Sequence, residues 1–142
     1  SDGTKGWTLE CQARNLGNCL NGVKPELGFM KMDGKEVFKF AVRKVPEIVE
    51  DILKEAEMTP EEIKYFVLHQ ANYRILEAAS RRLKIPMEKI PVNIDRYGNT
   101  SAASIPILLD EMKQEGKLKR GDKLVLAGFG SGMTWGATLL EW

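Results

Sequence analysis

The chain has 142 residues, of which 43% are hydrophobic and 29% are charged, which is ordinary for a globular protein with one core. The 21 basic and 20 acidic residues leave a formal net charge of +1, so no global field attracts nucleic acid or an anionic membrane. No apolar run of about 18 residues exists, and residues 1–6 are polar, so we expect neither a membrane span nor a signal peptide.

Two cysteines, Cys11 and Cys19, and a single histidine are too few for a disulfide scaffold or for the usual zinc spacings. We therefore expect no metal site, and a reducing cytoplasm is the simplest setting.

The N-terminal part of the chain reads as irregular with strand-like pieces. Alternation over 7–13 predicts a half-buried strand, 15–28 reads as a loop, and 29–32 is a short apolar piece before the turn at Asp33 and Gly34. Apolar residues then recur at helical spacing from Glu36 to Ala56. Pro46 interrupts this pattern, and a kink or a restart of the helix is expected there.

The rest of the chain alternates short apolar strands with helices. Thr59 opens a capping box with proline at the first helical position. Pro91 places the strand that contains it at an edge or start, and Pro106 is expected to bend the first turns of its helix. The predicted elements are strand 65–68, helix 72–84, strand 90–94, helix 101–115, strand 123–127, glycine-rich loop 128–132 and strand 134–142. This order predicts an α/β layer structure whose sheet is largely parallel, with the last two strands antiparallel.

Three polar or glycine-rich segments, 69–72, 97–101 and 129–132, each follow a predicted strand. Sites in such sheets gather at the carboxyl ends of the strands, so all three segments can lie at one rim.

Each segment has a structural and a functional interpretation. Taken alone, His69 is a hydrogen-bonded histidine at a strand end, or an imidazole that donates to developing negative charge. Asn99 belongs to a turn and helix start, or its amide donates to an oxyanion. The loop 129–132 is a hairpin turn or a source of backbone N–H donors, and it is neither a dinucleotide nor a phosphate-binding motif.

In the order in which they occur, three segments resemble the histidine, asparagine and glycine-loop motifs of β-ketoacyl-acyl-carrier-protein synthase III. The segment Gly34–Ala41 resembles the start of a long helix in the same enzymes. The resemblance runs from Ser1 to Trp142 and is strongest from Asp33 onward. The three motifs are His69-Gln70-Ala71-Asn72, Tyr97-Gly98-Asn99-Thr100-Ser101-Ala102-Ala103-Ser104 and Phe129-Gly130-Ser131-Gly132-Met133-Thr134-Trp135-Gly136.

This resemblance implies the C-terminal half of a thiolase-like α/β fold, with a mixed, mostly parallel sheet flanked by helices. Residues 1–45 would be a remnant that links a missing N-terminal half to the C-terminal domain, which spans 46–142. The implied site is a Cys-His-Asn constellation that condenses acyl-coenzyme A with malonyl-acyl-carrier protein, losing carbon dioxide, to start fatty-acid synthesis. His69 and Asn99 would be its catalytic donors.

The resemblance also implies substrate-binding residues and partners. The partners would be acyl-carrier protein, acyl-coenzyme A and the N-terminal half, within a homodimer, with no cofactor beyond the thioester substrates. Arg74 matches a carrier-docking arginine, and Asn72 matches a position near the pantetheine arm. Many family members have glycine where this chain has Ser131, whose backbone N–H would contribute to an oxyanion hole. The expected substrate-binding residues are Asn72, Arg74, Lys39, Phe38, Phe129, Gly130 and Ser131.

The family's nucleophilic cysteine lies in the other half of the enzyme. Cys11 lies in a strand-like alternation and Cys19 in a loop, and neither begins a helix that would activate a thiol. We therefore expect the chain to be inactive by itself. The alternatives are another Cys-His-Asn ketosynthase of secondary metabolism and a non-catalytic isolated domain.

Overall fold

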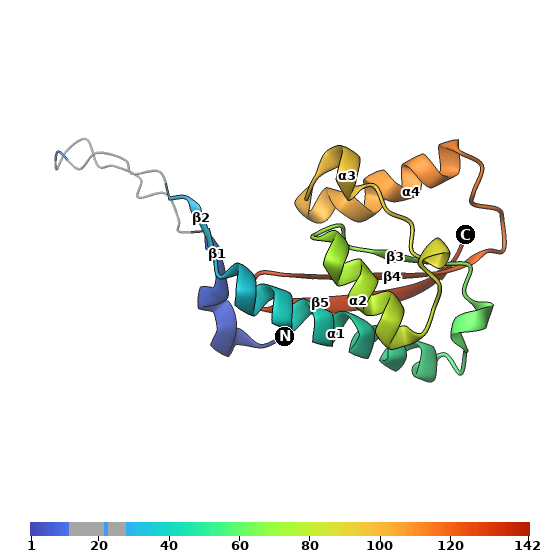
Figure 1. The fold of residues 1–142 in the computed structure, drawn as a ribbon, viewed down its shortest axis with the longest axis horizontal. Helices are drawn as coiled ribbons and strands as arrows, with labels where there is room; N and C mark the ends of the chain where they lie inside the picture. The colour runs from blue at the N-terminus through green and yellow to red at the C-terminus, as the bar shows by residue number, and fades with distance from the viewer. Residues whose placement is uncertain (12–21, 23–27) are drawn as a thin grey trace.

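The computed structural model describes residues 1–11, 22 and 28–142 of the chain. The fold has three layers (Figure 1). Helices α1 (Gly34–Glu55) and α2 (Tyr73–Leu83) cover one face of a three-stranded sheet, and α4 (Ser104–Gln114) covers the other. Within the described residues, no helix is long and apolar enough to cross a membrane.

The sheet is mixed, as expected. It consists of β3 (Tyr65–Leu68), β4 (Lys123–Gly130) and β5 (Thr134–Glu141), with β4 in the centre. The β3 and β4 strands run parallel, and β5 pairs antiparallel with β4 through a tight hairpin. In the part of the chain that the structure describes, the expected parallel character is therefore limited to one of the two strand pairings of this sheet.

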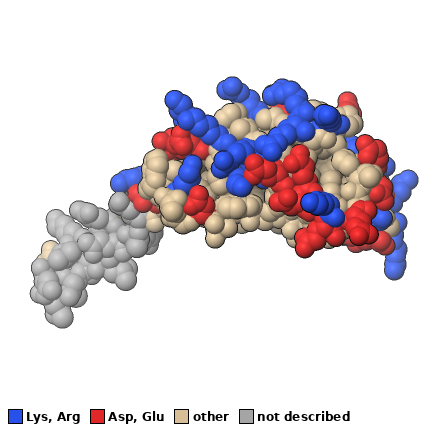
Figure 2. All heavy atoms as spheres, turned by 90° about the horizontal axis from the view of Figure 1, so that it is seen from below, with Lys and Arg blue, Asp and Glu red and all other residues tan. Residues whose placement is uncertain are grey.

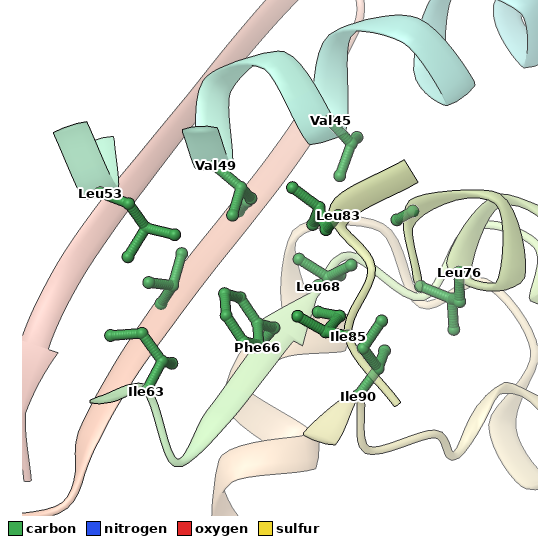
Figure 3. Close-up of a cluster of buried hydrophobic side chains, with 13 residues drawn as sticks. Val45, Val49, Leu53, Ile63, Phe66, Leu68, Leu76, Leu83, Ile85 and Ile90 are labelled. Carbon is green, nitrogen blue, oxygen red and sulfur yellow. The ribbon is translucent and has the colours of Figure 1, made fainter. Parts of the chain in front are cut away.

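The central sheet is buried on both faces because residues of β3 alternate between two apolar clusters. Phe66 and Leu68 pack with α1 and α2 in the cluster drawn in Figure 3, and Val67 between them packs against α4. Burying one such side chain stabilises the fold by about 1.5–3 kcal/mol. The first cluster contains Val45, Val49, Leu53, Ile63, Phe66, Leu68, Leu76, Ala79, Leu83, Ile85, Ile90, Val125 and Ala127.

Helix α1 begins at a strong N-cap and does not restart at Pro46. Two backbone N–H groups, of Lys35 and Glu36, donate to Oδ1 of Asp33 at 3.1 and 3.0 Å. The apolar face of α1 packs on the sheet on both sides of the buried Pro46. This packing keeps one helix where the backbone alone would favour two. The division expected between residues 45 and 46 lies inside α1, and it stays a prediction.

The predicted strand at 90–94 is wrong. Ile90 follows a 3-10 turn (Met87–Lys89), and Ile94 already begins the short helix α3 (Ile94–Tyr97). The buried side chain of Gln70 takes the place of a neighbouring strand here. Its Oε1 accepts from the backbone N–H of Asn93 at 3.1 Å, and its Nε2 donates to the Pro91 carbonyl at 3.4 Å.

Other boundaries differ by a few residues. In the expected strand at 7–13, residues 7 and 8 belong to a 3-10 turn (Gly3–Thr8), β1 (Leu9–Cys11) pairs antiparallel with β2 (Met30–Met32), and residues 12 and 13 lie outside the described residues. The loop predicted at 15–28 lies almost entirely outside the described residues. Residues 128–130 belong to β4 rather than to a loop. Pro106 falls in the first turn of α4, where a proline is tolerated.

Candidate active site

A cavity of about 780 Å³ opens at the carboxyl ends of β3 and β4. Its wall combines all three polar segments with the first turns of α1 and with residues of β1 and β2. His69 and Asn72 come from the segment after β3, Asn99 comes from the turn before α4, and Gly130 and Ser131 come from the end of β4 and the loop that follows. The structure therefore brings these five predicted site residues to one cavity.

The backbone and ring of His69 are both held in place. Its N–H donates to the Ala127 carbonyl at 2.9 Å, which extends the pairing of β3 with β4. Its Nδ1 lies 2.6 Å from Oγ of Ser104 at the start of α4. The Phe129 ring packs edge-on against the imidazole, with 5.4 Å between ring centroids. These contacts leave Nε2 as the ring nitrogen available to a ligand.

The surroundings of Ser104 indicate which tautomer His69 adopts. Ser104 is only 2% exposed, and its Oγ accepts from the backbone N–H of Gln70 at 3.3 Å. Among the contacts of the described residues, Nδ1 of His69 is the acceptor for the proton of the Ser104 hydroxyl. Leaving that buried hydroxyl without an acceptor would cost free energy of folding. Nδ1 therefore accepts and Nε2 carries the proton. Burial lowers the pKa of His69 below its ordinary value of 6.5, which favours the neutral ring.

Asn99 is exposed and lies just after α3. Its Oδ1 accepts the backbone N–H of Ser101 at 2.9 Å, which closes a small turn. Because the oxygen is occupied in this way, the Nδ2 amide group remains as a donor at the cavity wall. The turn and the donor interpretations of Asn99 are thus compatible.

The loop between β4 and β5 is braced by the N-terminal segment. Ser131 Oγ donates to the Leu9 carbonyl at 2.6 Å. Asp2 and Met133 exchange two backbone hydrogen bonds, each 2.8 Å long. Gly132 has φ of 136°, a conformation that favours glycine. The Ser131 side chain therefore restrains a loop that would be freer with glycine at this position.

The expected substrate-binding residues outside the three motifs separate into two groups. Phe38 lines the cavity, whereas Arg74 and Lys39 do not. The Arg74 guanidinium lies 5.5 Å from the Phe38 ring, and its backbone N–H is held by the Asn72 side chain at 2.9 Å. The Lys39 ammonium lies 2.7 Å from a carboxylate oxygen of Glu36, which raises the pKa of Lys39.

Cys11 is exposed on β1 and lines the cavity, but no helix begins there that would activate its thiol. Cys19 lies outside the described residues. Among the residues described, no group of His, Cys, Asp and Glu could hold a metal ion.

A sequence family described as the C-terminal part of 3-oxoacyl-[acyl-carrier-protein] synthase III matches residues 53–142, which is more than half of the chain. The chain belongs to this family. β-Ketoacyl-[acyl-carrier-protein] synthase III of Clostridium novyi (strain NT) is 48% identical over 143 residues, which cover all of this chain and 44% of that protein. The enzyme of that name from Synechocystis sp. is 54% identical over 111 residues, or 78% of this chain.

Solved synthase III structures confirm the thiolase-like fold. The Thermus thermophilus enzyme superposes with a TM-score of 0.88 at 42% identity, and the Aquifex aeolicus VF5 enzyme with 0.87 at 44%. Each comparison covers the whole of this chain but only 44% and 42% of the solved chains. The chain thus spans less than half the length of these synthase III relatives.

Sequence reasoning missed the residues that hold His69 and Asn99 in place. Ser104, Gln70 and Asn93 are buried polar residues that hold the segments of His69 and Asn99. Ser104 and Gln70 lie inside the quoted motifs, but their burial shows only in the folded chain.

Proposed function

We propose that this chain is the C-terminal part of an enzyme that condenses acyl-coenzyme A with malonyl-acyl-carrier protein, as the first step of fatty-acid synthesis. One observation carries the proposal. His69 and Asn99 line the same cavity, and each has its acceptor atom occupied by Ser104 or Ser101, so that an N–H donor remains on both. Two N–H donors at one cavity suit a substrate oxygen that gains negative charge.

Decarboxylation of a malonyl thioester creates such an oxygen. When the bond between the carboxylate and the α-carbon breaks, its electron pair forms an enolate and the charge moves to the thioester oxygen. In the proposed reaction, Nε2–H of His69 and the Nδ2 amide of Asn99 donate to this oxygen. Removing one such donor typically costs about 10²–10³-fold in rate, or about 3 kcal/mol. A neutral imidazole suits this role because it stabilises the oxygen without giving up its proton.

The enolate carbon then attacks the acyl group of an acyl-thioester, a carbon–carbon bond forms, and the thiolate leaves. In the proposal, a backbone N–H of the loop at Ser131 stabilises the oxyanion of this step and of the earlier acyl transfer. The contact between Ser131 and Leu9 supports this part, because it holds the loop in place. In the proposal, Asn99 does not take part in the acyl-transfer step.

We propose that the nucleophilic thiol comes from the part of the enzyme that this chain does not span. The strand location of Cys11 and the 44% coverage of the Clostridium novyi relative support this assignment. The proposal includes acyl-carrier protein and acyl-coenzyme A as partners, a homodimer, and a cytoplasmic setting. It includes no cofactor, because both substrates carry their own thioester.

The condensation test mixes the 142-residue chain with acetyl-coenzyme A and malonyl-acyl-carrier protein. We expect no acetoacetyl-carrier protein by mass spectrometry, and no acetyl adduct on Cys11 or Cys19. Robust product, or an adduct on either cysteine, would show that the chain supplies its own nucleophile.

The donor test uses the intact enzyme, meaning a chain of the relatives' full length that includes these residues. We expect His69→Ala and Asn99→Ala each to lower the release of carbon dioxide from malonyl-carrier protein by about 10²-fold or more. Acyl transfer from acetyl-coenzyme A should persist in Asn99→Ala. Unchanged decarboxylation in both variants would refute the proposed function and would favour a non-catalytic domain.

A further inference from the structure

The carboxylate of Glu111, on α4, receives donors from three side chains of one short segment. Oε2 accepts from Asn93 Nδ2 at 2.6 Å, and Oε1 accepts from Tyr97 Oη at 2.8 Å. The Arg96 guanidinium reaches both oxygens, at 2.9 and 3.1 Å. The Glu111 side chain is only 15% exposed. One carboxylate thus binds the segment 93–97, which directly precedes Gly98 and Asn99.

The same segment is bonded to the residue after His69. The Asn93 backbone N–H donates to Gln70 Oε1 at 3.1 Å, and the Gln70 backbone N–H donates to Ser104 Oγ at 3.3 Å. Gln70 and Asn93 are 0% and 2% exposed. A continuous hydrogen-bond network therefore runs from the hydroxyl beside the His69 imidazole to the carboxylate of Glu111.

The segment has little else to fix its position. Helix α3 is four residues long, far shorter than a helix that is stable by itself. Residues 95–99 are all exposed, and Gly98, which ends α3, has φ of 68°. Because residues 95–99 are exposed, the polar contacts of the segment to Glu111, together with the bond of Asn93 to Gln70, define where the turn begins.

We infer that Glu111 is a positioning residue, which holds the segment carrying Asn99 at a fixed place relative to His69. The inference rests on the proposed function, in which both side chains donate to one thioester oxygen. A displacement of about 1 Å at a reacting group can cost about 10²-fold in rate, so a small shift of the turn would matter. Glu111 itself lies outside the cavity wall and touches no reacting atom.

The test measures two steps of the intact enzyme separately. In Glu111→Gln, the new amide group must face one of the donors that the carboxylate accepted. We expect the maximal rate of carbon dioxide release from malonyl-carrier protein to fall by about tenfold or more, with KM and the rate of acyl transfer from acetyl-coenzyme A within about twofold of the parent. Tyr97→Phe, which removes one contact at an exposed side chain, should give a smaller loss in the same step.

Glu115→Gln is the matched control, because it removes the same charge one turn further along, where the carboxylate pairs with the exposed Lys117. It should leave both steps unchanged. Equal losses of decarboxylation and acyl transfer in Glu111→Gln, or no loss in either, would overturn the inference.

Asn99→Ala distinguishes a failure of the positioning role of Glu111 from a failure of the proposed function. If Asn99→Ala lowers the rate of decarboxylation while Glu111→Gln does not, only the positioning role of Glu111 is refuted. If neither Asn99→Ala nor His69→Ala lowers decarboxylation, the proposed function fails as well.

Discussion

Nδ1 of His69 lies 2.6 Å from Oγ of Ser104, across 35 residues of sequence. The hydroxyl accepts a backbone N–H from Gln70 and has its own proton left for the imidazole. One buried serine therefore decides which nitrogen of the only histidine presents a proton to the cavity.

Ser104→Ala should shift the His69 tautomer. Without the hydroxyl donor, Nδ1 no longer has to accept, so the fraction with the proton on Nε2 should fall. The loss of a buried hydrogen bond should also lower the free energy of unfolding by about 1 kcal/mol. Nitrogen-15 NMR of the imidazole reports the tautomer directly, and a single histidine gives an unambiguous spectrum.

Ser80→Ala is the control for Ser104→Ala. Ser80 is also a buried serine, but its Oγ donates to the Ile85 carbonyl at 2.7 Å and not to His69. It should lower stability without changing the imidazole spectrum. An unchanged spectrum in Ser104→Ala would contradict the assignment of the tautomer.

The imidazole of His69 should titrate below pH 6.5, because burial penalises its charged form. Between the folded pKa and 6.5, the unfolded chain binds more protons than the folded chain. The free energy of unfolding should therefore decrease as the pH falls through this window, and the contribution of His69 should be constant above it. An NMR titration of the ring gives the pKa, and His69→Gln should remove this part of the pH dependence. A pKa above 6.5 would contradict the prediction.

Arg74→Glu in the intact enzyme should raise KM for carrier-protein thioesters more than KM for coenzyme A thioesters. Figure 2 shows acidic and basic side chains interspersed over the face seen from below in Figure 1, so one charge reversal should act locally. Arg74 is exposed, and it lies over the Phe38 ring at the cavity. Steady-state kinetics with both substrate types gives the comparison.

Lys113→Glu makes the same charge reversal at an exposed position of α4, on the opposite side of the sheet, and serves as the control for Arg74. Its effect on both KM values should be small. Equal increases for carrier and coenzyme A substrates in Arg74→Glu would argue against carrier docking at this residue.

Ser131→Gly should loosen the loop between β4 and β5. It removes the 2.6 Å hydrogen bond to the Leu9 carbonyl and adds backbone freedom to the unfolded chain. We expect a loss of about 1 kcal/mol in the free energy of unfolding. Hydrogen exchange at the Met133 amide, which donates to Asp2, should become faster.

Thr4→Val is the control for Ser131→Gly. It removes a side-chain hydrogen bond from the same N-terminal segment, to Asp2, but it leaves the tie to the loop intact. Exchange at Met133 should change much less than in Ser131→Gly. Similar exchange rates in the two variants would show that Ser131 does not brace the loop.

The sequence by itself determined the main helices and the strands of the central sheet. Periodic apolar residues in α1, α2 and α4, and the apolar runs in β3 and β4, specify these elements because their side chains must leave water wherever the chain packs. The order of the elements also determined that His69, Asn99 and Ser131 follow strands or precede helices, so that one rim could collect them.

Only the tertiary structure decided how those residues are held. The segment 90–94 looks like a strand locally, but the Gln70 side chain bonds its backbone and α3 begins at Ile94. The contacts of Ser104 with His69, of Glu111 with Asn93, and of Ser131 with Leu9 join residues 18 to 122 positions apart. Hydrogen bonds between residues distant in sequence leave no periodic pattern, since each depends on where the packed layers place two atoms.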